Sequence, residues 1–217
     1  MDLFTRYVAA IPLKSQAAKD ISLTFVNGWI FKHGVPETVL SDNGVQFRGN
    51  IARLTAEILV MKQLFKSTYH SQTNGMLERF HRYLKKRLVT LVVDKNLDLD
   101  NGDALNIFLP AIVSSYNITP NRMTKTSPHE LVYGTVFVLP ADIKLGQLES
   151  KSAEKQDMHT FKKILKGQLR NLRDNAKKAQ MLYDMRRKKF ENKNQHQHSF
   201  EIGDKVLDLG DQRTGNK

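Results

Sequence analysis

The sequence predicts an α/β fold, in which short buried strands alternate with helices that pack on a sheet. Two short runs, Thr38–Leu40 and Lys62–Thr68, carry apolar residues over the length of a strand. The stretches before, between and after these runs have apolar residues at helical spacing. With 217 residues, of which 40% are hydrophobic, the chain can bury one core and carry an extension.

The N-terminal part is expected to contribute one strand and one long helix. Tyr7–Ile11 is apolar and partly β-branched, and Pro12 would end this strand. Apolar residues then recur at helical spacing from Ser15, a candidate N-cap, to Gly34, which can close the helix. This helix would pack on the sheet, and we expect the single tryptophan of the chain, Trp29, to lie in the core.

Turn and capping signals mark the remaining helices. Ser127, Pro128 and Glu130 form a capping-box pattern at a helix start. Pro110 lies inside another helical stretch, so we expect a kink there unless the helix begins at this residue. The other predicted helices in the middle of the chain cover residues 50–59, 76–91 and 104–118.

Two acidic residues stand where an α/β protein commonly binds ligands. Asp42 follows the strand Thr38–Leu40, and Glu78 falls in the first turns of a helix that Asn74 can cap. Open α/β sheets bind ligands at the carboxyl ends of their strands, and Mg²⁺ or Mn²⁺ prefers carboxylate oxygens. The pair is therefore a candidate cation site. In the alternative interpretation, Asp42 initiates a turn and Glu78 stabilises a helix N-terminus.

A strong positive charge indicates a polyanionic partner, of which nucleic acid is the first candidate. The formal net charge is +12 and the pI is about 9.8. Three basic residues lie with Glu78 on roughly one face of the predicted helix, namely Arg82, Lys85 and Lys86. This row is suited to contact phosphates. The alternative is a solvated helix face with one Glu-Arg pair.

A second basic region predicts a long helix near the C-terminus. Residues 151–191 contain 13 basic and 5 acidic side chains. A narrow apolar stripe follows helical spacing through Leu165, Leu169, Leu172, Ala176, Ala179 and Tyr183. Such a helix can pair with another helix, dock on the core, bridge to the C-terminal tail or lie along nucleic acid.

Two motifs and their spacing resemble those of a known enzyme family. Ser41–Phe47 reads Ser-Asp-Asn-Gly-Val-Gln-Phe, Asn74–Phe80 reads Asn-Gly-Met-Leu-Glu-Arg-Phe, and 35 residues separate Asp42 from Glu78. The combination resembles the last two carboxylates of the D,D-35-E integrases, in particular those of Gypsy-type LTR retrotransposons and retroviruses. Three further segments resemble the same family: Asp2–Leu13, Ser127–Gly134 and Phe200–Leu207.

The resemblance implies a ribonuclease-H-like fold, a mixed sheet with flanking helices, and metal-assisted phosphoryl transfer on DNA. It makes Asp42 and Glu78 ligands of Mg²⁺ or Mn²⁺. The family's first catalytic aspartate lies on an earlier strand, which we expect to be missing here, and Asp2 is expected to be a turn residue instead. Self-association and a nuclear location are further expectations. The residues expected to contact DNA are Thr73, Asn74, Arg82, Lys85 and Lys86.

The expected organisation has four parts: a truncated integrase core over residues 1–135, a linker over 136–150, the long basic helix over 151–192, and a polar linker with the first strand of an incomplete SH3-like barrel over 193–217. Two functions follow. One is DNA strand transfer with impaired activity, because one carboxylate of three is absent; the other is a non-enzymatic integrase remnant that binds DNA or a partner. The sequence has no apolar run that suggests a membrane span, and the lack of cysteine excludes disulfides and cysteine-ligated zinc.

Overall fold

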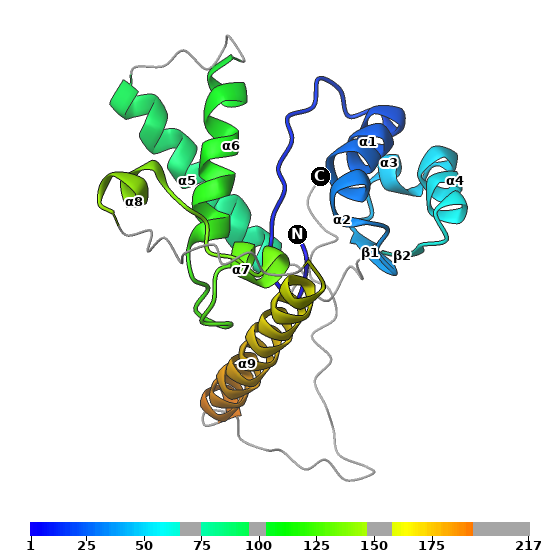
Figure 1. Ribbon diagram of the computed structural model, residues 1–217. Coiled ribbons are helices and arrows are strands. Elements are labelled where there is room, and N and C mark those ends of the chain that lie inside the picture. The colour runs from blue at the N-terminus through cyan, green and yellow to red at the C-terminus, as the bar shows by residue number, and fades with distance from the viewer. Residues whose placement is uncertain (66–74, 96–102, 147–157, 193–217) are drawn as a thin grey trace, which may run out of the picture.

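The computed structural model describes residues 1–65, 75–95, 103–146 and 158–192 (Figure 1). One group of elements contains the two strands with the helices α1 to α4, and another contains the helices α5 to α8. In the view of Figure 1 the N-terminal segment, in dark blue, runs between these groups, and the long helix α9 extends away from them. The described part of the chain is therefore rich in helix, with one small sheet.

The sheet of the described residues consists of two parallel strands. β1 (Thr38–Ser41) pairs with β2 (Lys62–Phe65). The helices α3 (Val45–Arg48) and α4 (Asn50–Ile58) form the crossover that a parallel pair requires. The strand predicted at Thr38–Leu40 is confirmed, and so is the first part of the strand predicted at Lys62–Thr68, of which residues 66–68 lie outside the described residues. The described residues do not form the wider mixed sheet that the sequence led us to expect.

One continuous helical run precedes β1 and confirms the predicted long helix. It comprises α1 (Ala18–Phe25), the π-helical turn η1 (Val26–Ile30) and α2 (Phe31–His33). Gly34 follows with a φ of 86°, which glycine adopts without the strain that other residues would incur. Ser15 does not cap this run, because the N-cap position falls two residues later.

Helices α5 (Gly75–Lys95) and α6 (Asp103–Ile118) pack against each other and form an aromatic part of the core. Phe80 is only 2% exposed, and its ring lies edge-on to Tyr116 with the centroids 5.0 Å apart. Pro110 lies inside α6. The helix therefore does not begin at this proline, and the kink expected there stays a prediction.

The N-terminal segment is not the strand that its composition predicts, because Tyr7–Ile11 has no regular secondary structure. Val8 is buried as an apolar strand residue would be, but it pairs with a side chain of α6. Its N–H donates to Asn117 Oδ1 at 3.0 Å, and Asn117 Nδ2 donates to its carbonyl oxygen at 2.9 Å. A strand needs a neighbouring backbone that pairs with it along its length, whereas the Asn117 side-chain amide pairs with the backbone groups of Val8 alone.

Helix α7 (Pro128–Tyr133) has the predicted capping box. The Glu130 N–H donates to Ser127 Oγ at 3.2 Å, and the Ser127 N–H donates to the Glu130 carboxylate at 3.0 Å. Gly134 ends the helix in the left-handed conformation, with a φ of 76°. A short helix, α8 (Pro140–Lys144), follows inside the segment that we expected to be an irregular linker.

The long basic helix is α9 (Met158–Asn192), and it docks on α7. Leu169 comes so close to Gly134 that a Cβ there would lie 2.8 Å from Leu169 Cγ. Ala176, in the predicted apolar stripe, is fully buried. Of the roles considered for this helix, docking on the core is therefore the one observed.

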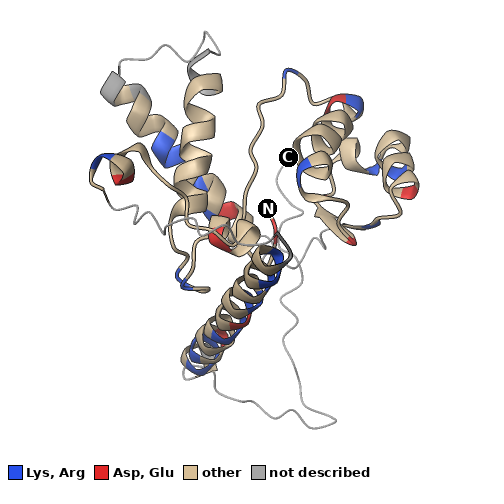
Figure 2. Ribbon diagram, viewed as in Figure 1, with Lys and Arg blue, Asp and Glu red and all other residues tan. Residues whose placement is uncertain are grey.

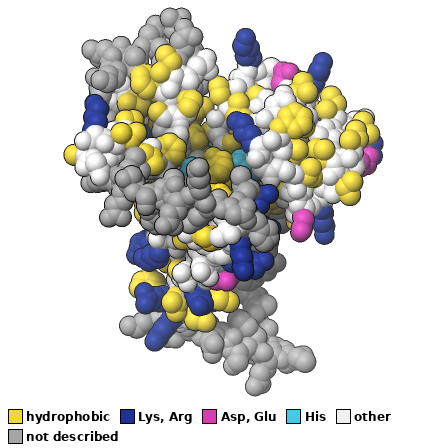
Figure 3. Space-filling view, viewed as in Figure 1, with side chains coloured by type: hydrophobic (Ala, Val, Ile, Leu, Met, Phe, Trp, Pro, Cys, Tyr) yellow, Lys and Arg dark blue, Asp and Glu magenta, His cyan; other side chains and the backbone are white. Residues whose placement is uncertain are grey.

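The rest of α9 is covered with charge. Lys and Arg positions recur along the helix in Figure 2, and Figure 3 shows basic side chains beside exposed apolar ones on its visible face. The predicted barrel strand in residues 193–217 lies outside the described residues. Among the helices that are described, none combines the length and apolar character needed to cross a bilayer.

Candidate functional site

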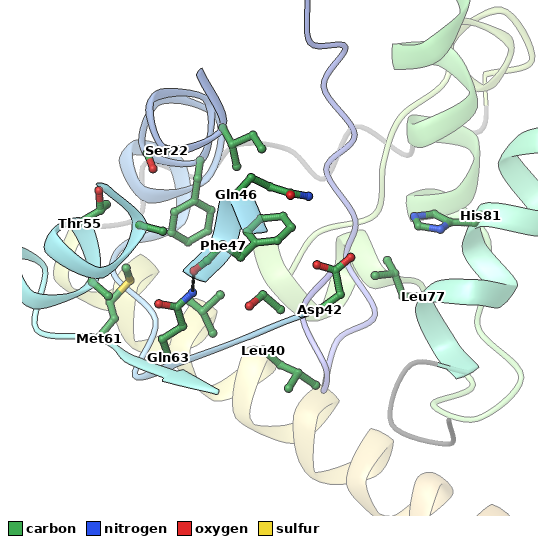
Figure 4. A pocket seen from close by; sticks show the side chains of 16 residues that line it. Ser22, Leu40, Asp42, Gln46, Phe47, Thr55, Met61, Gln63, Leu77 and His81 are labelled. Atoms are coloured by element: carbon green, nitrogen blue, oxygen red, sulfur yellow. Dashed lines mark hydrogen bonds between the residues drawn. The ribbon is translucent and has the colours of Figure 1, made fainter. Parts of the chain in front are cut away.

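A cavity of about 390 Å³ lies beside β1 and β2, and α5 closes one side of it (Figure 4). Most of its lining is apolar and comes from α1, the strands, α3 and α4. Asp42 lies at the α5 side of this cavity, near Leu77 and His81 in Figure 4. The end of β1 and the beginning of α5, which are far apart in the sequence, thus contribute to one cavity.

Asp42 takes part in a turn and keeps one carboxylate oxygen available. It follows β1 directly, its side chain is exposed, and its Oδ1 accepts a hydrogen bond from the Gly44 N–H at 3.0 Å. This is the turn role that the sequence offered as the alternative to cation binding. The other oxygen, Oδ2, accepts no hydrogen bond from a residue that the structure describes, so the turn leaves room for a ligand.

Glu78 lies in the first turn of α5 and has an exposed side chain. Its neighbour Leu77 lines the cavity, and so does His81, which lies three residues after Glu78 and close to it in angle around the helix. Asp42 and the first turn of α5 are therefore parts of the same region. That Asp42 and Glu78 share an ion stays a prediction.

The described residues do not complete a metal site. No three His, Asp or Glu side chains in this part of the chain come together closely enough to hold an ion. Mg²⁺ needs near-octahedral oxygen coordination and gives up its waters reluctantly, so Asp42 and Glu78 alone would hold it weakly. Within the described ranges, the donor set is incomplete for the cation that the resemblance implies.

The residues expected to contact DNA fall in two places. Thr73 and Asn74 lie outside the described residues. Arg82, Lys85 and Lys86 lie on α5 with exposed side chains, and none of them forms an ion pair with a described residue. These three cations are accessible to a phosphate backbone.

Asp2 occupies the turn that the sequence predicts. Its Oδ1 accepts hydrogen bonds from the N–H and the hydroxyl of Thr5, both at 2.6 Å, and its own N–H donates to the Tyr7 carbonyl oxygen at 2.9 Å. It does not line the cavity of Asp42.

His81 was missed in the sequence. The only signal that could have found it is its three-residue distance from Glu78, which places both side chains on one side of a helix.

The chain is similar in sequence to polyproteins of transposons and retroviruses. It is 25% identical over 214 residues, 95% of this chain, to the retrovirus-related Pol polyprotein from transposon 412 of Drosophila melanogaster. It is 28% identical over 134 residues, 62% of this chain, to the Gag-Pol polyprotein of baboon endogenous virus (strain M7). The chain spans only 15% of the first polyprotein and 7% of the second. No protein-family profile matches it.

One solved structure agrees with this relationship at the level of the fold. A chain in the simian T-cell lymphotropic virus intasome in complex with the PP2A regulatory subunit B56 gamma aligns with a TM-score of 0.51 and 20% identity, over 64% of this chain and 48% of that one. The HTLV-2 integrase catalytic core domain in complex with magnesium (trimeric form) aligns with a TM-score of 0.48 and 20% identity, over 60% and 80% of the two chains. This chain is thus a homologue of retroviral and retrotransposon Pol polyproteins, and its motifs resemble those of their integrase catalytic core.

Proposed function

We propose that this chain acts on DNA as an integrase-type strand-transfer domain, in which Asp42 and Glu78 are the catalytic carboxylates. The observation that carries the proposal is the shared cavity between the end of β1 and the first turn of α5. By the resemblance, Asp42 and Glu78 would hold the divalent cations, which would supply the Lewis-acid chemistry of phosphoryl transfer. Homology to Pol polyproteins supports the same class of reaction.

The basic row of α5 supports DNA as the substrate. Arg82, Lys85 and Lys86 follow Glu78 along the same helix, so phosphates held by them would lie next to the proposed carboxylates. We assign Thr73 and Asn74 to the DNA end by the same resemblance. Self-association and a nuclear location remain part of this proposal; the similar HTLV-2 domain was solved in a trimeric form.

The second candidate is a DNA-binding remnant without catalytic activity. The incomplete set of metal donors among the described residues favours it. Losing one ligand of a two-metal site weakens the binding of both ions, while the exposed cations of α5 and α9 retain their affinity for phosphates. The two candidates therefore differ in catalysis and not in DNA binding.

A strand-transfer assay separates the two. The full chain is incubated with Mn²⁺ and a labelled duplex that carries a free 3′-hydroxyl, and joined products are resolved by size. Asp42→Asn and Glu78→Gln are tested against two matched controls at exposed acids elsewhere, Asp174→Asn and Glu37→Gln. If the chain catalyses strand transfer, the yield of joined product should fall by at least about a hundredfold in Asp42→Asn and Glu78→Gln and stay unchanged in the two controls. Equal activity in all four variants would refute the assigned site.

Absence of product needs a second measurement. The remnant function is supported if the chain yields no joined DNA but binds the labelled duplex. In that case, replacing Arg82, Lys85 and Lys86 together by Gln should weaken the binding and reduce its dependence on salt concentration. If the chain neither joins nor binds DNA, both candidates are wrong.

A further inference from the structure

A second cavity, of about 720 Å³, lies on a different part of the molecule. Its walls are the N-terminal turn, the end of α2, the helix α7 and one side of α9, close to the N-terminus in Figure 1. It shares no lining residue with the cavity of Asp42.

Aromatic rings form one continuous wall of this cavity. The His33 ring lies 4.7 Å from Trp29 and 5.2 Å from Tyr7 between centroids, and Tyr7 lies 5.9 Å from Tyr133. Trp29, which we expected in the core, is only partly buried, and Tyr133 is 44% exposed. Rings that are packed on one side and accessible on the other offer a surface on which a planar group can stack.

Three cations from two separate elements surround these rings. Lys32 comes from α2, and Arg173 and Lys177 come from α9; all three side chains are exposed. None forms an ion pair with any residue that the structure describes. Asp2 is the acid among the described lining residues, and its Oδ1 is already engaged by Thr5. The cavity is therefore positively charged around an aromatic wall.

Two contacts hold the α9 cations in place. Arg173 Nε donates to the Leu131 carbonyl oxygen at 3.2 Å, which fixes the guanidinium and leaves its terminal nitrogens for a ligand. Lys177 Nζ lies 6.0 Å from the centre of the Phe4 ring. Positioned cations beside stacking rings are the combination that binds a base together with its phosphate.

We propose that this cavity binds an unpaired nucleotide of a single-stranded nucleic acid, with the base on the aromatic wall and the adjoining phosphates at Lys32, Arg173 and Lys177. A duplex keeps its bases stacked inside, so only an unpaired base can reach the wall. The site goes beyond strand transfer, because it requires neither Asp42 nor a metal ion.

Trp29 provides a direct readout, because it is the only tryptophan of the chain. The full chain is titrated in EDTA with an oligothymidylate of about twelve nucleotides, and its tryptophan fluorescence is measured. Stacking predicts saturable quenching. An abasic strand of the same length keeps the phosphates without the bases, and should quench at least about tenfold less. A blunt duplex of matched length tests the strand preference.

Substitutions test the residues by fluorescence anisotropy of the labelled oligothymidylate. Lys177→Gln should weaken binding about fivefold or more, whereas Lys178→Gln, the same change at the next and also exposed position of α9, should have less than about a twofold effect. Tyr133→Leu should weaken binding, and Tyr133→Phe, which retains the ring, should not. Circular dichroism checks that each variant keeps its helical content.

The outcomes separate this site from the catalytic proposal. Asp42→Asn should bind the oligothymidylate as the original chain does, whether or not strand transfer is observed. Equal affinity of Lys177→Gln and Lys178→Gln, or equal quenching by the normal and abasic strands, would overturn the proposed site. Preference for the duplex over the single strand would also overturn it.

Discussion

Replacing Asn117 by alanine should destabilise the protein strongly, because one side chain satisfies both backbone polar groups of Val8. The two hydrogen bonds measure 3.0 and 2.9 Å, and Asn117 is 4% and Val8 2% exposed. Water therefore has little access to the groups that the substitution would leave unpaired. A buried polar group without a partner costs about 1–3 kcal/mol, so the loss of two partners should lower the free energy of unfolding by roughly 2–6 kcal/mol.

Urea unfolding followed by far-ultraviolet circular dichroism measures this loss. Asn175→Ala is the matched control, since Asn175 is exposed on α9 and its substitution should change the free energy of unfolding by less than about 0.5 kcal/mol. Hydrogen exchange adds a local readout, because the Val8 amide should lose its protection in Asn117→Ala. An unchanged stability together with an unchanged exchange rate at Val8 would refute the reasoning.

Asn117→Asp refines the same test. Its carboxyl can still accept from the Val8 N–H, but it can donate to the Val8 carbonyl oxygen only when protonated. The protonated form is therefore favoured in the folded state, and the folded pKa rises above the ordinary value of about 3.9. The variant should be nearest to the original protein in stability below about pH 4 and should lose stability as the pH rises through the folded pKa.

Two further predictions concern the fold. Gly134→Ala should lower the free energy of unfolding by roughly 1–2 kcal/mol because of the left-handed conformation, and by a further amount because the new Cβ would meet Leu169. Gly146 has a φ of 64° and no atom near the position of a Cβ, so Gly146→Ala should show only the conformational loss in the same urea titration. Equal losses in the two variants would contradict the contact with Leu169. Burial lowers the pKa of His33 and of His129 below 6.5. As the pH falls, these histidines are therefore protonated in the unfolded chain before they are protonated in the folded protein, so stability should decrease as the pH drops through about 6.5. Glutamine at both positions should flatten this pH dependence in thermal melts, and an unchanged slope would exclude the two histidines as its source.

Features set by neighbouring residues were predictable from the sequence. The capping box of Ser127 and Glu130 depends on contacts over three residues, and it appears as predicted. Gly34 ends a helix because glycine tolerates its positive φ, which is also a local property. The strand before Asp42 is short and bounded by a turn, so its composition and the residues that flank it both indicate a strand.

Features set by distant partners were not predictable. Tyr7–Ile11 has the composition of a strand, but its conformation depends on Asn117, more than a hundred residues later in the chain. Trp29 was assigned to the core from its helical spacing, which does not reveal that its ring lies beside His33 in the wall of an open cavity. Periodicity identifies an apolar face, whereas the completeness of its burial depends on tertiary packing.

The π-helical turn η1 links the geometry of the two cavities. Phe25, just before it, lines the cavity of Asp42, and Trp29 and His33, within and after it, line the aromatic one. A π-helical turn contains about one residue more than an α-helical turn, so removing one residue here, such as the exposed Asn27, would restore ordinary α-helical winding with little rotation of the residues downstream. The wider turn thus absorbs one residue between the two cavities, whereas a further insertion that kept the present winding would turn Trp29 and His33 by about 100° relative to Phe25.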